Sequence, residues 1–203
     1  MKRMILCVAG ALLAATMNVG PASAVFIAGF ESGLQGFDPP YTGTGTLSTG
    51  SDGATEGSSA LQFDTPAGAF VGTQSFGINQ ADLIGAAVAG DTIMIDVRVA
   101  VPNDTDFATL RTGINSDQGF QETSDQPVPI DGTPTTLSWD LGDWTTLNGS
   151  ETFAGLILAV NSKVGSSMVF QIDNIRTVPI PEPGALALAL IGTAVLHLNR
   201  RRK

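Results

Sequence analysis

The sequence predicts an all-β fold, a β-sandwich, for the central part of the chain. Short apolar segments are separated by turn residues, mainly Gly, Pro and Asp, and almost no stretch shows the 3.6-residue period of a helix. The clearest strand covers residues 92–101, where every second side chain is a branched aliphatic one, namely Ile93, Ile95, Val97, Val99 and Val101. This alternation is typical of a strand with one buried face.

The remaining elements follow in chain order. Residues 25–30 form an apolar strand that ends at Glu31, where Ser32 and Gly33 turn the chain. Residues 41–57 are rich in Gly, Ser and Thr without periodicity, which predicts an exposed loop or a weak hairpin. Residues 80–88 are expected to make a short helical turn. The other expected strands cover residues 59–63, 70–78, 108–115, 135–141, 155–161 and 168–177.

The first 24 residues have the pattern of a signal peptide. Lys2 and Arg3 provide a positive start, residues 5–15 are apolar, and Ala22 and Ala24 form an A-x-A cleavage site. We therefore expect a signal-peptide helix that signal peptidase removes after Ala24. The single cysteine, Cys7, leaves with it, so the mature protein has no disulfide and no thiol nucleophile.

Residues 179–203 look like a second targeting signal. Pro181, Glu182 and Pro183 precede an apolar run over residues 184–198, and a basic cluster closes the chain: Arg200, Arg201, Arg202 and Lys203. As a helix the run would reach only ~22 Å, whereas a membrane core is roughly 30 Å thick. A short hydrophobic helix of this kind suits a transient anchor, with the basic cluster held in the cytoplasm.

This tail resembles the PEP-CTERM sorting signal of bacterial surface and matrix proteins, with its tripeptide, hydrophobic segment and basic stop in the same order. The resemblance implies that an exosortase recognises the tripeptide and processes the protein at the inner membrane. It then implies a location at the cell surface or in the extracellular matrix. The alternative for the same residues is a plain C-terminal membrane anchor.

The region between the signals, residues 25–178, has the size of one domain and is strongly acidic. It holds 18 of the 19 Asp and Glu residues but only four of the ten Lys and Arg residues. Such a surface repels nucleic acid and anionic membranes. It suits a secreted protein among neutral polymers and divalent cations.

Five segments of this region resemble, in order, the jelly-roll β-sandwich of carbohydrate-binding modules and galactose-binding-like domains. They are FESGLQGF, GSSALQF, AGDTIMIDVRV, LSWDL and VFQIDNIRTV. In many such modules a structural Ca²⁺ joins the first and last strands. The resemblance places its ligands at Glu31 and Asp173, with a backbone carbonyl near Gly33. In the alternative, Glu31 only caps a turn and Asp173 pairs with Arg176 or solvent.

Catalysis is not expected. The only histidine is His197, in the tail, so residues 25–178 contain no Ser-His-Asp triad and no histidine metal ligand. No carboxylate stands in a recognisable hydrolase motif. We therefore expect a protein that is not an enzyme.

Sugar binding needs an aromatic ring with polar neighbours that bond hydroxyl groups. Trp144 follows a Gly-Asp turn and is expected to be exposed, so the candidate ligand-binding residues are Trp144, Asp143 and Tyr41. Trp139 lies within a strand and is expected in the core.

Together these observations predict an exported, exosortase-processed surface or matrix protein whose non-catalytic β-sandwich associates with extracellular polysaccharide. The alternatives are a calcium-stabilised, lectin-like protein and a permanently membrane-anchored adhesin.

Overall fold

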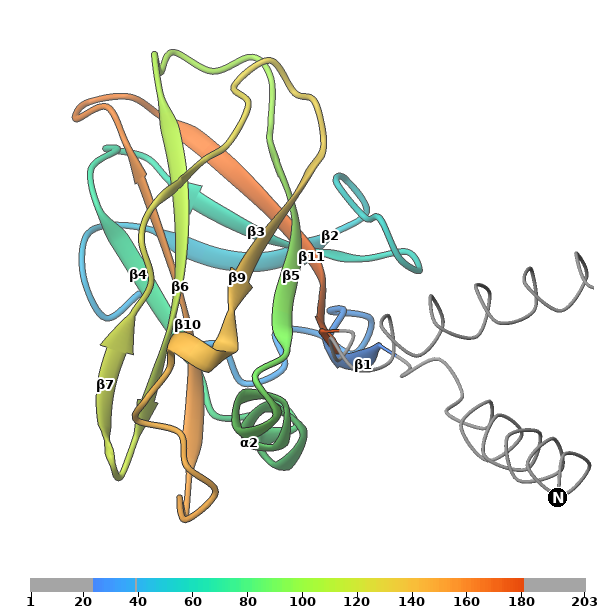
Figure 1. Cartoon of the computed structure of the whole chain (residues 1–203). Helices are drawn as coiled ribbons and strands as arrows, with labels where there is room; N and C mark the ends of the chain where they lie inside the picture. The colour runs from blue at the N-terminus through green and yellow to red at the C-terminus, as the bar shows by residue number, and fades with distance from the viewer. Residues whose placement is uncertain (1–23, 39, 181–203) are drawn as a thin grey trace, which may run out of the picture. The chain divides into compact units, whose positions relative to one another are not determined.

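Two antiparallel β-sheets face each other and enclose the hydrophobic core (Figure 1). This computed structural model describes residues 24–38 and 40–180. Residues Ala24–Pro179 form one compact unit with its own core. Because this unit contains both faces of the sandwich, we expect it to fold independently. The signal-peptide helix and the C-terminal hydrophobic helix expected from the sequence lie outside the described residues, apart from Ala24.

The first sheet has the strand order β2-β3-β11-β5-β9, with β1 paired to β11, and the second has the order β4-β10-β6-β7, with β8 paired to β6. The strands are β1 (Val25–Ala28), β2 (Thr46–Gly50), β3 (Ala60–Thr65), β4 (Val71–Ser75), β5 (Thr92–Val99), β6 (Ala108–Ser116), β7 (Gly119–Glu122), β8 (Gln126–Pro127), β9 (Thr135–Asp140), β10 (Ala154–Ser162) and β11 (Met168–Val178). The predicted β-sandwich is confirmed.

The alternation in β5 produces the core as expected. Ile93, Ile95, Val97 and Val99 are all buried, and they share one core with alternate residues of β10 in the other sheet, namely Leu156, Leu158 and Val160. Val101 was expected on the same face but is exposed, because β5 ends at Val99.

The short helical turn expected at residues 80–88 is the helix α2 (Gln80–Ala89). The Asn79 side chain accepts a hydrogen bond from the backbone N–H of Asp82 at its start. Gly90 ends the helix at φ 72°, where its N–H reaches the carbonyls of the last turn. Leu83, Ala86 and Ala87 are buried, so α2 closes one end of the core.

Three strands were not predicted as such. β2 lies inside the Gly-, Ser- and Thr-rich stretch expected to be a loop or weak hairpin. β7 and β8 are only four and two residues long, and β8 contains Pro127. β7 and β8 are strands because they pair with β6, and no local sequence pattern predicts this pairing.

The two ends of the compact unit leave it side by side. β1 pairs antiparallel with the end of β11, so that Val25 lies opposite Thr177 and Phe26 opposite Arg176. Over the described residues, no helix is long and apolar enough to cross a membrane.

Candidate functional site

The outer surface of the sheet β4-β10-β6-β7 carries the candidate site, and we call it the β10 face. Alternate residues of β10 point into the core, so Gly155, Ile157 and Ala159 point outward. Strand register aligns them with outward residues of the neighbouring strands. The β10 face comprises Gly72, Gln74, Thr109, Arg111, Gly113, Asn115, Phe120, Glu122, Gly155, Ile157 and Ala159, with Tyr41, Phe70, Phe76 and Phe153 from flanking segments.

Two glycines allow aromatic rings to lie directly on this sheet. A Cβ atom at Gly72 would lie 2.6 Å from the Tyr41 hydroxyl oxygen. A Cβ atom at Gly155 would lie 2.5 Å from Cε1 of Phe76. Any larger side chain at either position would therefore push a ring off the surface.

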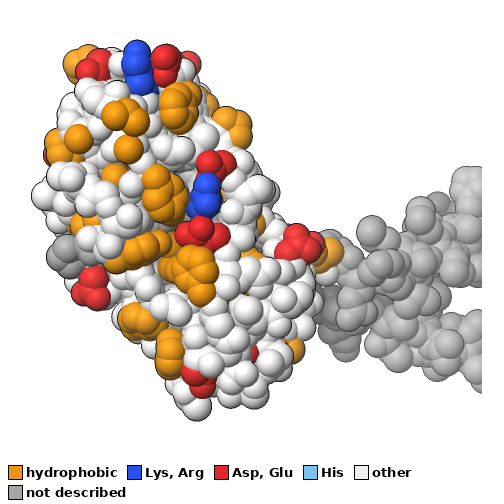
Figure 2. Space-filling model, turned by 90° about the vertical axis from the view of Figure 1, so that its left-hand side faces the viewer, with side chains coloured by type: hydrophobic (Ala, Val, Ile, Leu, Met, Phe, Trp, Pro, Cys, Tyr) orange, Lys and Arg blue, Asp and Glu red, His pale blue; other side chains and the backbone are white. Residues whose placement is uncertain are grey.

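Aromatic side chains remain accessible on the β10 face. Tyr41 is 51% exposed and Phe120 57% exposed, and Phe76 and Phe153 are also exposed. Phe76 and Phe153 pack edge to face, with ring centroids 5.7 Å apart. Figure 2 shows this side of the molecule, where hydrophobic side chains gather around a basic group that acidic groups flank.

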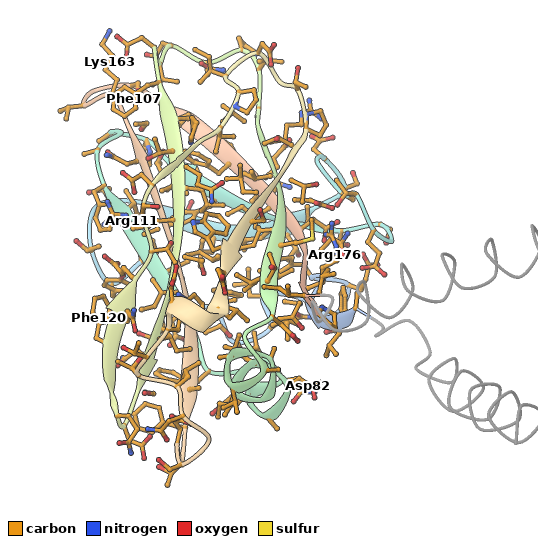
Figure 3. The ribbon with its side chains drawn as sticks, in the orientation of Figure 1. Asp82, Phe107, Arg111, Phe120, Lys163 and Arg176 are labelled. Atoms are coloured by element: carbon orange, nitrogen blue, oxygen red, sulfur yellow. The ribbon has the colours of Figure 1, made fainter. Side chains whose placement is uncertain are left out.

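Arg111 is held rigidly at the centre of this surface, on β6, and Figure 3 shows it above Phe120 of β7. Its Nη1 lies 3.2 Å from Oε2 of Glu122, its Nε donates to Asp125, and its guanidinium lies 5.1 Å from the centroid of the Phe70 ring. The hydrogen bond and the charge of Asp125, together with Glu122, raise the pKa of Arg111. The side chain is therefore fixed and charged, but neutralised by its partners.

Tyr41 lies in the same electrostatic environment. Partial burial and the negative charge of Glu122 raise the pKa of its hydroxyl, and the positive charge of Arg111 only partly opposes this. The hydroxyl therefore keeps its proton and remains a hydrogen-bond donor.

The face also carries amide and hydroxyl groups. Asn115 Nδ2 donates a hydrogen bond of 3.4 Å to Oε1 of Gln74. Gln74 Nε2 and Thr109 Oγ1 are buried without a hydrogen-bond partner among the described residues. Buried polar groups are normally bonded, so these atoms are candidates to bind an ordered water. Stacking rings beside amide and hydroxyl groups suit the recognition of a sugar.

The structure separates the predicted ligand-binding residues. Tyr41 belongs to the β10 face, whereas Trp144 is only 2% exposed, so its expected exposure is wrong. A 3-10 turn, η1 (Leu141–Asp143), directs the Trp144 ring into the core with Leu141 and Leu147. The three-residue spacing of these apolar side chains was the signal for an inward-facing turn.

Asp143 is exposed, and its backbone carbonyl accepts a hydrogen bond of 2.6 Å from Gln121 Nε2 at the edge of β7. Trp139 lies in the core as expected, with its Nε1 donating to the carbonyl of Ser124 at 3.2 Å. Neither residue belongs to the β10 face. The sequence does not reveal the phenylalanines and amides of this face, because they lie on separate strands and meet only through sheet register.

The two carboxylates expected to bind a cation hold the same loop, residues 51–59 between β2 and β3. Glu31 accepts two backbone bonds of 2.7 Å from Ser58 and Ser59 and one of 2.8 Å from the Ser58 hydroxyl. These bonds, first that from the Ser58 backbone, lower the pKa of Glu31. Asp173 Oδ2 accepts backbone bonds of 2.7 Å from Thr55 and 2.9 Å from Glu56.

Arg176 does not pair with Asp173, so the pairing expected in the alternative is wrong. It pairs instead with Asp96, the cross-strand neighbour of Asp173, at 3.2 Å. Asp96 also accepts bonds from Thr136, Thr55 and Asn174. Burial favours the neutral form of Asp96, but these bonds and the Arg176 charge outweigh it and lower its pKa.

Of the carboxylate oxygens expected to bind a cation, only one is free to do so in the part of the chain that the structure describes. Asp173 is fully buried, and its Oδ1 has no hydrogen-bond partner among the described residues. Both oxygens of Glu31 are already engaged, and the described residues contain no group of three or more His, Cys, Asp or Glu that could hold a metal. A Ca²⁺ ion here would therefore rely on Asp173 and on backbone carbonyls, such as that expected near Gly33.

No protein-family model and no curated protein matches the chain. Solved structures do resemble it. One is a carbohydrate-binding module, CBM28, specific for non-crystalline cellulose, with a TM-score of 0.58 and 12% identity over 79% of this chain and 98% of that one. Another is CBM27-1 of Caldicellulosiruptor saccharolyticus in complex with mannohexaose, with a TM-score of 0.54 and 16% identity over 78% and 98%.

An exo-β-agarase also resembles the chain, with a TM-score of 0.53 and 15% identity over 77% of this chain but 25% of that one. At these identities the similarity concerns the fold. The domain has the jelly-roll β-sandwich fold found in carbohydrate-binding modules.

Proposed function

We propose that this protein binds an extracellular polysaccharide through its β10 face and has no catalytic activity. The observation that carries the proposal is the combination on one sheet of exposed rings lying on glycines with the amide groups of Gln74 and Asn115, of which Gln74 Nε2 lacks a partner among the described residues. Tyr41 and Phe120 would stack on sugar rings, while Gln74 and Asn115 would bond hydroxyl groups. The carbohydrate-binding modules that share the fold are consistent with this role.

The charge of the domain favours a neutral polysaccharide. Its acidic residues greatly outnumber its basic ones, and Arg111, the basic residue of the β10 face, is already paired with Glu122 and Asp125. An anionic chain would find no free positive charge there and would meet repulsion. A neutral glycan needs only stacking and hydrogen bonds.

A polysaccharide array, followed by calorimetric titration of the binders, tests this function. Tyr41→Ala should weaken binding at least tenfold, because it removes a ring that lies on the sheet. Phe26→Ala is the matched control, since Phe26 is an exposed ring on β1, which belongs to the other sheet. Equal affinity of wild type and Tyr41→Ala, or an equal loss in both variants, would contradict the proposal.

Export and exosortase processing remain part of the proposed function. The support is the N-terminal A-x-A site and the order of tripeptide, apolar run and basic cluster at the C-terminus. The intact mass of the exported protein should correspond to a start at Val25 and the absence of the C-terminal basic cluster. Replacing Pro181, Glu182 and Pro183 by alanines should trap precursor in the inner membrane, and normal release of that variant would contradict exosortase recognition.

A second candidate property is stabilisation by Ca²⁺. The buried, unpartnered Oδ1 of Asp173 favours it. A cation that binds only the folded state at a hundredfold excess over its Kd stabilises by ~2.7 kcal/mol. At fixed ionic strength, Ca²⁺ should raise the Tm more than Mg²⁺ does, and Asp173→Ala should abolish the difference. Equal effects of the two ions on the wild type would exclude the site.

A further inference from the structure

The strand β2 is an unprotected sheet edge. It ends the sheet order β2-β3-β11-β5-β9 and pairs with β3 alone. In an antiparallel pair, alternate backbone groups of an edge strand point away from its partner. No hydrogen bond to another segment occupies that side of Thr46–Gly50 among the described residues. The strand therefore presents free N–H and C=O groups to a new partner.

The edge of β4 is covered by the chain itself. Residues 37–38 and 40–42 run along it, with bridges from Phe37 to Ser75 and from Thr42 to Gly72. Backbone bonds of 3.0 Å and 2.9 Å to the carbonyls of Gln74 and Gly72 reinforce this cover.

Side-chain hydrogen bonds tie other segments to the edge strands β7 and β9. Gln121 of β7 donates to the carbonyl of Asp143, which holds residues 143–146 against that strand. Gln126 donates to the carbonyl of Ser138, an edge carbonyl of β9. On β8, Pro127 has no N–H to offer. Of the edges of β2, β4, β7, β8 and β9, that of β2 has no covering segment, side-chain hydrogen bond or proline among the described residues. Natural sheets normally protect their edges by such means.

The charge distribution indicates which kind of partner can approach β2. Residues 39–51 contain no charged side chain, although the domain around them is strongly acidic. Two copies of this domain would repel each other over most of their surfaces. At β2 the approaching side chains are Thr, Leu, Ser and Gly, so this repulsion is weakest there.

We propose that two copies of this protein associate through β2, paired antiparallel about a two-fold axis near Ser48. Such an edge is self-complementary, because each strand presents the same donors and acceptors to the other. Thr46 of each copy would lie near Gly50 of the other. The contact would join the β2-β3-β11-β5-β9 sheets of the two copies into one continuous sheet. Both β10 faces would stay free. Because each strand contributes only five residues, the contact is weak, and dimers would form where the protein is locally concentrated.

Sedimentation of residues 24–179 over a wide concentration range tests the proposal. The wild type should show a monomer–dimer equilibrium. Ser48→Glu places two like charges close together across the two-fold axis and should weaken dimerisation at least tenfold. Ser138→Glu is the matched control, because Ser138 is an exposed serine on the outer face of the edge strand β9 in the same sheet.

Hydrogen exchange at low and high protein concentration locates the contact. Amides of residues 46–50 should become protected at high concentration in the wild type and not in Ser48→Glu. A monomer at all concentrations, growth into long polymers, or equal weakening by Ser48→Glu and Ser138→Glu would overturn the proposal. Glycan binding by Ser48→Glu should be unchanged, so this test is independent of the β10 face.

Discussion

Asp173→Ala should detach the loop of residues 51–59 from the sheet. In the native domain, Asp173 Oδ2 accepts short backbone bonds from Thr55 and Glu56 and a longer one, 3.3 Å, from the Thr55 hydroxyl. Alanine provides no acceptor, so these donors lose their partner at a site where the side chain is fully buried. The loop should then open toward solvent.

The size of the effect follows from these contacts. A hydrogen bond to a charged group contributes about 1.5–3 kcal/mol, so the two backbone bonds together contribute roughly 3–6 kcal/mol. Removing Asp173 also relieves its repulsion of Asp96, but Arg176 already neutralises Asp96, so we subtract only about 1 kcal/mol. The free energy of unfolding should fall by about 2–5 kcal/mol, which lowers the Tm by roughly 5–15 °C.

Urea unfolding without added Ca²⁺ measures this change, and hydrogen exchange of the Thr55 and Glu56 amides locates it. Asp173→Asn keeps one acceptor oxygen and should lose less stability than Asp173→Ala. If Asp173→Ala unfolds within about 0.5 kcal/mol of the wild type and those amides exchange at an unchanged rate, then Asp173 does not hold the loop.

Acid, alkaline titration of Tyr41 and one glycine substitution test other parts of the structure. Because the pKa values of Glu31 and Asp96 are lowered, the folded state binds fewer protons in acid than the unfolded chain does. The urea midpoint should therefore be constant above about pH 5 and fall below it. A flat profile down to about pH 3 would contradict this. Tyr41 is the only tyrosine, so phenolate absorbance should report its raised pKa directly, with stability lost as the pH rises through that value. Glu122→Gln should lower this pKa, and an unchanged titration would show that the two groups do not interact. Gly155→Val should displace Phe76, weaken glycan binding and cost about 1–3 kcal/mol of stability; full binding by this variant would show that the ring position is irrelevant.

The fold was predictable because its main signals are local. The alternation in β5 sets one buried face, and Gly90 marks the end of α2, whatever the rest of the chain does. β7 and β8 were not predictable in this way, since their few residues become strands only by pairing with β6. Trp144 was misplaced because a Gly-Asp turn suggested exposure, whereas the 3-10 turn points the ring inward.

The candidate site was less predictable than the fold. Tyr41 was identified from its residue type, but Gln74, Arg111 and Phe120 come from three different strands and meet only through sheet register. The sequence also does not show which neighbour occupies the space left by a glycine. The role of Gly155 appears only when the ring of Phe76 is seen to occupy the space of its missing side chain.

The most direct test of the account is to map glycan binding on residues 24–179 by NMR, using a neutral polysaccharide fragment selected on the array. Binding through the β10 face should shift the signals of Gly72, Gln74, Arg111 and Asn115 saturably, while those of Ser48 and Gln62 on the other sheet stay constant. Shifts confined to the sheet of β2 and β3, or no saturable shift with any neutral polysaccharide, would contradict the assignment of the β10 face as a carbohydrate-binding surface.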